Sequence, residues 1–515
     1  MLPPLIQALR DPACYLHPVE RVDIVETHIS WVLLTGRYAY KIKKPVDLGF
    51  LDFSSLDRRE HFCREELRLN RRTAPDLYLD VVAISGSITA ARVGGGGRAI
   101  EYAVQMRQFE HDRQLDRLTD SGGISVEEMA DFGARMAALY DTVSVDREGR
   151  FGGAEQVGSL ALDNLTTLSP LLEARHAEVL ARLRSWTQEV LRDLVEQFAE
   201  RQAGGFIREC HGDLHLSNLV KLDSGITAFD CIEFDPALRW IDTISDVAFL
   251  VMDIDSRGRS ELASSFLNAY LEKSGDYSGV RLLRFYLVYR SLVRCKVAAL
   301  RLGQSGLLAE ERARAGEKLQ RHLELAAALI EAPEPRVILM HGLAASGKTT
   351  WSARLMLYLP AVRIRSDVER KRRALLDADL YSRATSRATY ERLVQLAGDV
   401  VEGGFTVVVD AAFLRREERR RFYELARRLG VEWRILACRA GDDTKVLRLR
   451  RRGLEGKDAS DADEQVLAWQ RRTAEPLEAD ERARAVEIHT DREVDMAALL
   501  DDLRPSLLRR PSGSL

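Results

Sequence analysis

His211-Gly212-Asp213-Leu214-His215-Leu216-Ser217-Asn218 decides the fold of the first part of this 515-residue chain. It places an acidic residue, Asp213, five positions before an amide, Asn218. Asp230 then follows the apolar run Ile226–Phe229. Phosphoryl transfer needs one group that orients or deprotonates the acceptor hydroxyl and metal ligands that hold the triphosphate. We therefore predict Asp213 as a catalytic residue, and Asn218 and Asp230 as Mg²⁺ ligands.

The same chemistry needs a lysine on the ATP phosphates and a helix glutamate that holds this lysine. The strand ending in Lys41-Ile42-Lys43 offers two lysines on one face, since side chains two positions apart point alike. Lys41 is preferred, with Lys43 or Lys44 as the alternative. Glu66 is preferred to Glu65 as the helix partner.

Two further segments are expected beside the nucleotide of this first site. Thr27–Ser30 stands where a glycine-rich loop usually covers the phosphates, and no GxGxxG motif is present. Glu101–Met106 is expected to form the hinge that binds adenine through backbone groups. Met106 is thus predicted to contact the cofactor. His211 and His215 are expected to brace the catalytic loop by hydrogen bonds.

The loop, Asp230 and the Asp242–Asp246 region together resemble the catalytic signature of the aminoglycoside phosphotransferase-like family. The resemblance spans about residues 20–330 and implies a bilobal kinase fold acting on a small-molecule hydroxyl or amine. Asp230-Cys231-Ile232-Glu233 departs from Asp-Phe-Gly, and Glu233 is a candidate additional metal or water ligand.

Arg290 and Arg294 lie four residues apart in the part of this domain that normally shapes the acceptor site. They are candidates for binding an anionic acceptor. A solvated or salt-bridged helix face is an equally good interpretation.

A second nucleotide signature begins at Gly342, where Gly342-Leu343-Ala344-Ala345-Ser346-Gly347-Lys348-Thr349 follows an apolar strand and opens a helix. Backbone amides of such a loop surround phosphate, the lysine reaches the β/γ-phosphates, and the threonine coordinates Mg²⁺. The cofactor-binding residues predicted here are Gly342, Ala345, Ser346, Gly347, Lys348, Thr349 and Thr350.

Acidic and basic residues complete this second site. Asp367, after the second apolar run, is predicted to activate an acceptor hydroxyl. Asp410, at the end of Thr406–Val409, is predicted to help bind Mg²⁺, with a helix N-cap as the alternative. Arg448 and Arg452, with Arg451 as an alternative, are predicted to reach the transferring phosphate from a lid.

The Walker loop, the Ser366-Asp367 stretch, Asp410 and the segment Lys457–Ala462 together resemble P-loop kinases related to polynucleotide 5′-kinases, zeta-toxin kinases and gluconate kinases. This resemblance covers about residues 336–500. The domain order also resembles bacterial fusions of an aminoglycoside phosphotransferase-like domain with an ATP-binding kinase.

The expected fold class is α+β for a bilobal protein-kinase-like domain, followed by an α/β P-loop domain with a doubly wound parallel sheet. The Pro-containing segment after residue 331 is taken as the boundary. The expected parts are a kinase-like domain (1–331; N-lobe about 20–106, C-lobe about 107–331), a linker (332–335), a P-loop domain (336–505) and a disordered tail (506–515).

Composition sets outer limits on function. The chain is 46% hydrophobic and 30% charged, without a membrane-length apolar run, a secretory signal or a CxxC pair. A cytoplasmic protein with reduced thiols and no membrane partner is expected. The part after residue 336 is mildly basic, with arginine clusters at 415–421 and 448–452.

The leading hypothesis is a bifunctional phosphotransferase with two Mg²⁺·ATP sites. The first would act on a small metabolite, and the second on a polynucleotide 5′-hydroxyl or a small molecule. Two alternatives remain open: one domain is a regulatory nucleotide sensor for the other, or the chain processes RNA or DNA ends. The sequence leaves the oligomeric state unknown.

Overall fold

The computed structural model describes residues 2–49, 51–331, 333–374, 383–455 and 463–503. Contacts divide the chain into two compact units. The first is Met1–Gly258 with Tyr289–Ala326, and the second is Arg259–Val288 with Ala327–Leu515. The boundary at 332–335 stays a prediction, and the predicted tail lies outside the described residues.

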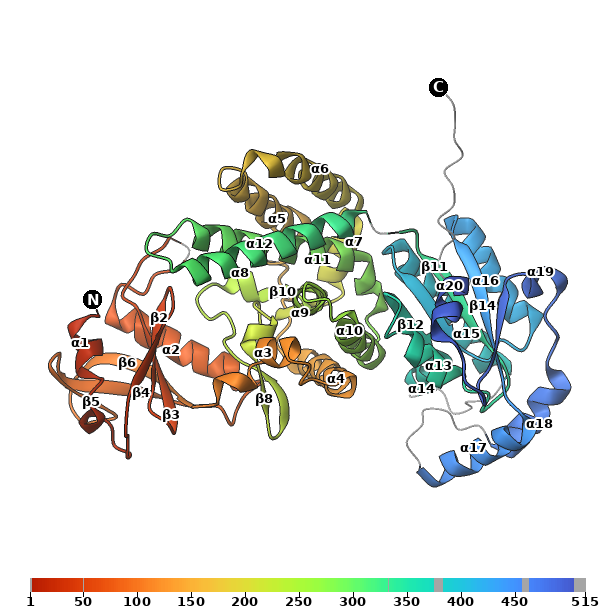
Figure 1. Ribbon diagram of the computed structural model, residues 1–515, viewed down its shortest axis with the longest axis horizontal. Coiled ribbons are helices and arrows are strands. Elements are labelled where there is room, and N and C mark those ends of the chain that lie inside the picture. The colour runs from red at the N-terminus through yellow and green to blue at the C-terminus, as the bar shows by residue number, and fades with distance from the viewer. Residues whose placement is uncertain (1, 50, 332, 375–382, 456–462, 504–515) are drawn as a thin grey trace. The chain divides into compact units, whose positions relative to one another are not determined.

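The first unit begins with a six-stranded antiparallel sheet in the order β1-β2-β3-β6-β4-β5. Helix α2 (Leu56–Asn70) lies against one face of the sheet (Figure 1), and the N-terminal α1 (Pro4–Ala8) packs on the other. The strands are β1 (Asp23–Glu26), β2 (Ser30–Leu34), β3 (Tyr38–Lys43), β4 (Tyr78–Ser87), β5 (Ala90–Val93) and β6 (Ala99–Arg107).

Side-chain hydrogen bonds set two local features of this lobe. Strands β1 and β2 are separate, because Thr27 Oγ1 accepts from the Ser30 N–H and closes a turn between them. Helix α2 is capped by Ser55, because the Ser55 hydroxyl accepts the Arg58 N–H.

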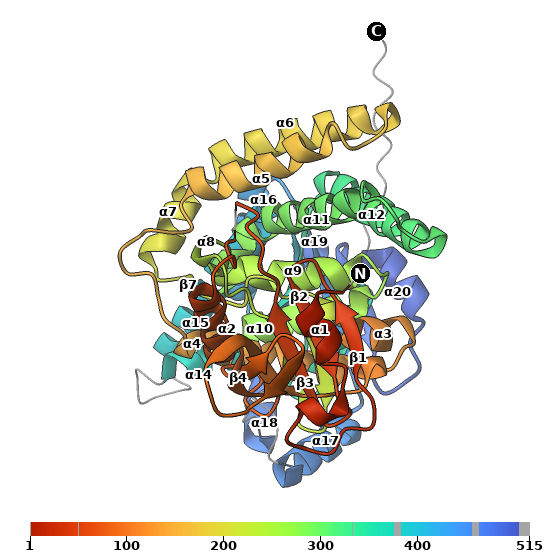
Figure 2. The same cartoon turned by 90° about the vertical axis from the view of Figure 1, so that its left-hand side faces the viewer.

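The rest of the first unit is mainly helical. Helices α5 and α6 run side by side (Figure 2), and α6 and α7 are separated at Leu194, where the backbone leaves helical geometry. Two short antiparallel pairs, β7–β10 and β8–β9, flank the catalytic loop. The main helices are α4 (Val126–Thr142), α5 (Ala154–Leu168), α6 (Ala177–Asp193), α7 (Val195–Ala203), α9 (Thr243–Asp255) and the larger parts of α11 (Val280–Leu302) and α12 (Ala309–Ile330). The short strands are β7 (Ile207–Glu209), β8 (Leu219–Leu222), β9 (Gly225–Ala228) and β10 (Trp240–Asp242).

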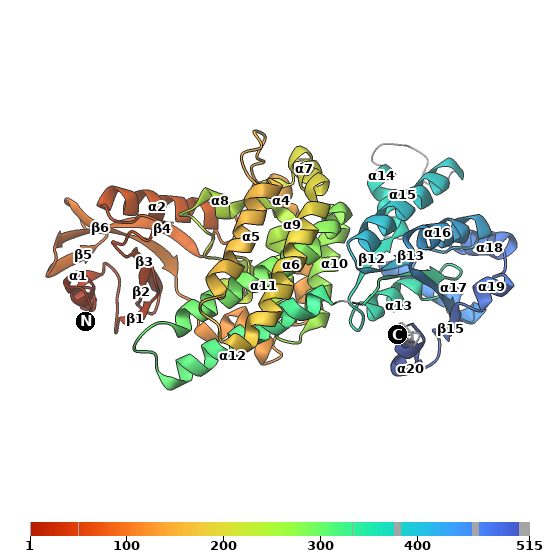
Figure 3. The ribbon, with the colours of Figure 1, turned by 90° about the horizontal axis from the view of Figure 1, so that it is seen from above.

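The second unit is built on a five-stranded parallel sheet in the order β12-β13-β11-β14-β15. Helices α15 and α16 cover one face, while α13 and α20 cover the other (Figure 3). The predicted doubly wound sheet is confirmed. Its strands are β11 (Arg336–His341), β12 (Ala361–Arg365), β13 (Thr406–Asp410), β14 (Glu432–Arg439) and β15 (Ala485–His489). Its helices are α13 (Lys348–Leu355), α14 (Ser366–Ala374), α15 (Arg383–Glu402), α16 (Arg416–Leu429), α17 (Asp442–Glu455), α18 (Glu464–Thr473), α19 (Ala479–Arg482) and α20 (Met496–Leu503).

Helix α10 (Ser260–Ser274) covers the edge strand β12 of this sheet. Asn268 Nδ2 donates to Ala361 O at 3.1 Å, and its Oδ1 accepts the Arg363 N–H at 2.7 Å. Glu272 forms ion pairs with Arg363 and Arg365. Side chains therefore satisfy backbone groups that an open sheet edge would expose. Across the described ranges, no helix has the length and apolar character needed to cross a membrane.

Two candidate phosphotransfer sites

A carboxylate on α9 shapes the backbone of the first catalytic loop. Asp246 accepts the N–H groups of His211 at 2.8 Å and Gly212 at 3.1 Å, and the Tyr140 hydroxyl at 2.6 Å. Gly212 has a φ of 85°, and a Cβ there would lie 2.7 Å from Leu238 O. The loop conformation therefore requires glycine at this position.

Asp213 lies beside Asn218 and His215, as the loop pattern predicts. Asn218 Nδ2 donates to the Asp213 carboxylate at 3.0 Å, and His215 Nε2 lies 3.3 Å from it. Desolvation acts to raise the pKa of Asp213, but His215 and then Arg294 hold that pKa well below its usual value. Asp213 is therefore ionised and can accept a hydrogen bond from a hydroxyl group.

Both candidate lysines of β3 reach Glu66 on α2. Lys41 Nζ lies 2.8 Å from one Glu66 carboxylate oxygen and 2.5 Å from Asp230, while Lys43 lies 2.7 Å from the other Glu66 oxygen. Lys43 also pairs with the buried Glu233. Burial opposes the charge on Glu66, but the two lysines keep the pKa of this carboxyl group below its usual value.

These contacts separate the two lysines. Lys41 joins Glu66 to the partly exposed Asp230, whereas Lys43 is fully buried between two glutamates. Burial is the main cause of the raised pKa of Glu233. The arrangement favours Lys41 as the phosphate-binding lysine. It places Glu233 in an interior ion pair instead of at an exposed metal position.

Asp230 has a left-handed backbone conformation, with a φ of 63°. Its N–H donates to the Tyr78 hydroxyl at 3.1 Å, and the next N–H, of Cys231, donates to Asn70 Oδ1 at 2.9 Å. A non-glycine residue at positive φ is strained and persists where the surroundings fix it. The turn leaves the Asp230 side chain 44% exposed.

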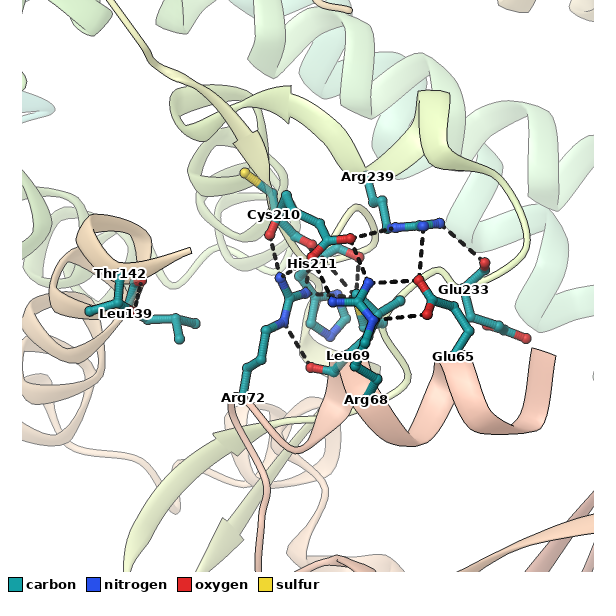
Figure 4. A network of polar contacts seen from close by, with 12 residues as sticks. Glu65, Arg68, Leu69, Arg72, Leu139, Thr142, Cys210, His211, Glu233 and Arg239 are labelled. Carbon is teal, nitrogen blue, oxygen red and sulfur yellow. Dashed lines mark hydrogen bonds and ion pairs between the residues drawn. The ribbon is translucent and has the colours of Figure 1, made fainter. Parts of the chain in front are cut away.

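A cluster of arginines ties α2 to the strands beside the catalytic loop (Figure 4). Glu209 pairs with Arg68 at 2.6 Å, Arg72 at 3.3 Å and Arg239 at 3.3 Å. Arg72 also donates to Cys210 O, the residue before the loop. The helix that carries Glu66 is therefore held against the segment that carries Asp213.

The structure places the other residues predicted near the nucleotide of this unit in different environments. The Thr27 hydroxyl bonds to Ser30 within the β1–β2 turn, so its hydrogen bonds are made inside the turn. Met106 is half-buried on β6, beside β3. His211 braces the loop as expected, since its Nε2 lies 2.9 Å from Phe229 O. Burial lowers the pKa of His211.

In the second unit, the Walker loop joins β11 to α13. Ala345 and Gly347 have φ values of 58° and 93°, and a Cβ at Gly347 would lie 2.9 Å from Thr490 Oγ1. Lys348 Nζ donates to Gly342 O at 2.9 Å and to Leu343 O at 2.8 Å. The backbone therefore curls around the lysine amine. Thr349 is half-buried and Thr350 exposed at the start of the helix.

Asp410 ends β13 close to the base of this loop. The Ser352 hydroxyl lies 3.2 Å from Asp410 and 3.0 Å from Thr349 O, and Arg365 lies 3.8 Å from the same carboxylate. The next helix begins at Arg416, so the N-cap alternative for Asp410 is wrong. Asp367 lies in the first turn of α14 and pairs with Arg370 at 2.9 Å.

Of the predicted lid arginines Arg448 and Arg452, the structure describes the side chain of Arg448. Arg448 donates to Ala345 O at 3.2 Å and to Thr490 O at 2.8 Å, and so braces the Walker loop from outside. The Arg452 side chain and the segment Lys457–Ala462 lie outside the described residues. The transition-state role of these arginines stays a prediction.

Comparisons with known proteins identify the type of both domains. Residues 65–283 match the phosphotransferase enzyme family, and residues 337–477 match an AAA domain. Uncharacterized proteins of Mycobacterium tuberculosis and Mycobacterium bovis are each 30% identical over 428 residues, covering 78% of this chain and 81% of theirs. The chain belongs to the same family as these mycobacterial proteins. It is an ATP-dependent phosphotransferase with two kinase-type domains.

Solved structures similar to each part are more distant. A choline/ethanolamine kinase family protein from Mesorhizobium loti covers 63% of this chain and 97% of its own, at 13% identity and a TM-score of 0.39. The Mycobacterium tuberculosis APS kinase, solved with AMPPNP and APS, covers 33% and 99%, at 22% identity and a TM-score of 0.24.

Sequence reasoning missed two residues that contact the Walker loop of the second unit. Gln470 of α18 accepts the Ala344 N–H of the Walker loop at 2.7 Å, and Thr490 accepts from Arg448 and donates to Ser346 O. Both are more than 100 residues from the loop in sequence. No motif marks them, because their contacts arise only when the sheet is assembled.

Proposed function

We propose that this phosphotransferase has two separate Mg²⁺·ATP sites, each of which transfers the γ-phosphate to a hydroxyl acceptor. The first domain acts on a small metabolite. The second acts on a polynucleotide 5′-hydroxyl or a small molecule. The observation that carries the proposal is that each unit has its own acidic and phosphate-binding groups. In the first unit Lys41 pairs with Asp230, and Asp213 lies beside Asn218. In the second unit Lys348 lies within the Walker loop, Asp410 contacts Ser352, and Asp367 lies in the first turn of α14.

In the first domain, Asp213 accepts the hydrogen bond of the acceptor hydroxyl and points the oxygen at the γ-phosphorus. The new P–O bond forms as the bond to the bridging oxygen breaks, and the electron pair leaves with ADP. The hydroxyl proton passes to Asp213 and then to solvent. Because the pKa of Asp213 is low, we expect proton transfer late in the reaction.

The residues around Asp213 fit a hard cation. Asn218 donates through its amide nitrogen, so its carbonyl oxygen is the atom left to bind metal. The partly exposed Asp230 adds a carboxylate. Mg²⁺ prefers such oxygen ligands and takes others from phosphates and water. When bound, Mg²⁺ would neutralise charge on the phosphates.

In the second domain, Lys348 exchanges loop carbonyls for phosphate oxygens. Thr349 and Asp410 supply oxygen atoms suited to Mg²⁺, and Asp367 orients the acceptor. Many arginines of the 415–421 cluster are already paired, including Arg419 with Glu481 and Arg421 with Glu417. This pairing favours a small acceptor over a polynucleotide.

Transfer of γ-labelled phosphate tests the proposal. Wild type, Asp213→Ala and Lys348→Ala are incubated with Mg²⁺·ATP and either a 5′-hydroxyl oligonucleotide or a pool of small metabolites and aminoglycosides. Asp213→Ala should lower first-domain transfer by about 10²–10⁴-fold while nucleotide binding survives. Lys348→Ala should remove transfer by the second domain alone. Exposed Asp223→Ala and Lys273→Ala serve as matched controls.

The acceptor that carries label decides between the alternatives. Label on the oligonucleotide that is lost only in Lys348→Ala, and that falls steeply with added salt, would assign polynucleotide kinase activity to the second domain. Full transfer by Asp213→Ala to every first-domain acceptor would refute the role of Asp213. ATP hydrolysis without any labelled acceptor would favour the regulatory alternative.

A further inference from the structure

A basic residue of α11 lies beside the first catalytic loop. Arg290 is buried and donates to Gly212 O and the Ser245 hydroxyl, which fixes this face of α11 against the loop. Arg294 follows one turn later on the same face. Across the part of the chain that the structure describes, no hydrogen bond or ion pair to Arg294 is formed. The two arginines therefore differ: Arg290 is structural, and Arg294 is available.

Helix α12 adds further cations at this place. The Ser291 hydroxyl donates to His322 O at 2.7 Å and so joins α11 to α12. His322 Nε2 lies 3.9 Å from Asp253, whose other oxygen accepts the catalytic-loop N–H of Leu216 at 3.0 Å. Lys318 lies one turn before His322 on the same helix, and Arg321 directly precedes His322.

Arg257, after α9, completes a group that we call the basic cluster: Arg257, Arg294, Lys318 and Arg321. Arg257 pairs with Asp120 at 2.6 Å. Within the described ranges the side chains of Lys318 and Arg321, like that of Arg294, make no hydrogen bond or ion pair. The acidic groups facing the cluster are Asp116, Asp120, Asp213 and Asp253.

Several side-chain nitrogens of this region are buried without a hydrogen-bond partner among the described residues. They are Nε of Arg257 and Arg321, and Nδ1 of His215 and His322. His322 is only 2% exposed. Buried polar atoms normally have a partner, so a group of unpartnered nitrogens near the catalytic loop is not expected from packing alone.

Electrostatics support the same location. Arg294 lowers the pKa of both Asp213 and Asp253. Burial is the main cause of the lowered pKa of Lys318, and Arg294 and Arg257 lower it further. The cations are therefore near enough to one another to repel. An added anion would relieve that repulsion.

We propose that the acceptor of the first domain carries a phosphate or carboxylate group, which the basic cluster binds while the acceptor hydroxyl meets Asp213. This inference rests on the proposed phosphotransferase activity of that domain. It assigns an anionic acceptor class where the resemblance to aminoglycoside kinases suggests cationic ones. Arginine and lysine at the partly buried site would supply charge-assisted hydrogen bonds to the anion.

Matched acceptors test the inference in the Lys348→Ala chain, where only the first domain transfers phosphate. The probes are glucose, glucose 6-phosphate, gluconate, ribose, ribose 5-phosphate and one aminoglycoside. We expect kcat/KM at least about tenfold higher for an anionic sugar than for its neutral parent. Arg294→Gln should raise the KM for the anionic sugar about tenfold or more, with a smaller change in kcat.

Arg184→Gln is the matched control, because Arg184 lies on α6 and contacts Thr166. Thermal unfolding gives a second readout. Ribose 5-phosphate with a non-hydrolysable ATP analogue should raise the first-domain transition more than ribose does. Arg294→Gln should remove that difference and Arg184→Gln should keep it.

Three results would overturn the inference. They are preference for a neutral or cationic acceptor, equal effects of Arg294→Gln on neutral and anionic sugars, or no transfer to and no stabilisation by any anionic probe. A raised KM for ATP alone would assign the cluster to the nucleotide. If the first domain transfers phosphate to neutral glucose and Asp213→Ala abolishes this transfer, the proposed function stands. Only the proposal of an anionic acceptor is then rejected. Transfer that survives Asp213→Ala would reject the proposed role of that domain.

Discussion

At the scale of single residues, three neighbouring lysines differ in their contacts, and we assign a catalytic role to one and structural roles to the others. Lys41 pairs with Glu66 and the partly exposed Asp230, Lys43 is buried between two glutamates, and Lys44 pairs with the exposed Glu26. The sequence ranks these lysines as candidates for binding phosphate only by their position in the strand. Because their burial and ion pairs differ in the structure, we assign different roles to them.

We predict that Lys41→Met lowers first-domain transfer by about 10²–10³-fold while the fold survives, because a preorganised charge on the phosphates is lost. Lys43→Met should instead destabilise the first unit by about 3–5 kcal/mol, because it leaves the buried Glu233 without its lysine. Urea unfolding and labelled-phosphate kinetics measure the two effects.

Lys44→Met is the control for both variants. Its exposed ion pair should contribute no more than about 1 kcal/mol. A Lys43→Met chain that unfolds like wild type and yet fails to bind nucleotide would exchange the roles of Lys41 and Lys43.

At the scale of elements, β11 carries a buried histidine into the Walker loop. His341 Nδ1 lies 3.1 Å from Phe413 O. Burial, and then the nearby cations Arg419, Arg439 and Lys348, lower the pKa of His341 from 6.5 to about 4. The strand therefore contains neutral histidine at pH 7.

This shift predicts a pH dependence of stability in the second unit. Below pH 6.5 the unfolded chain binds a proton at His341 that the folded chain refuses, so stability falls until the pH reaches about 4. The loss is at most about 1.4 kcal/mol per pH unit, and above pH 6.5 the histidine contributes none. Urea unfolding at pH 7 and pH 5 measures it, following the transition that Mg²⁺·ATP raises in wild type but not in Lys348→Ala.

His341→Gln is the matched comparison for this prediction, because glutamine keeps a donor for Phe413 O and does not titrate. Its stability should change less than that of wild type between pH 7 and pH 5. Equal slopes for the two proteins would show that another group causes the pH dependence.

At the scale of the whole molecule, each unit carries its own nucleotide signature and its own acidic residues. We predict that wild type binds two molecules of a non-hydrolysable ATP analogue per chain at saturation. Lys348→Ala should bind one, and Asp213→Ala should still bind two, since Asp213 faces the acceptor. Equilibrium dialysis measures the stoichiometry.

One nucleotide per wild-type chain would contradict two working sites and would favour a regulatory role for the other unit. A change in the affinity of the first site on Lys348→Ala would show that the sites are coupled. Lys273→Ala, an exposed lysine in the same unit, is the control.

Both architectures, and the positions of both phosphate-binding loops, could be predicted from local patterns in the sequence. Catalytic-loop spacing and the Walker motif are short-range patterns, and the glycines in them are required by backbone geometry that each loop adopts. Buried apolar runs separated by helices also predicted the parallel sheet, because strand burial and helix periodicity are written into neighbouring residues.

Which distant side chains contact one another could be seen only in the folded structure. It separated Lys41 from Lys43, placed Arg448 on Ala345 and Thr490, and distinguished the bound Arg290 from the available Arg294. Contacts between residues far apart in the sequence depend on how helices and strands pack. Such residues do not recur at a fixed spacing, so no pattern in the sequence marks them. The charges in a sequence indicate the type of ligand that a site would bind. The burial of each charged side chain, and whether it already has a partner, decide which of these charges can bind that ligand.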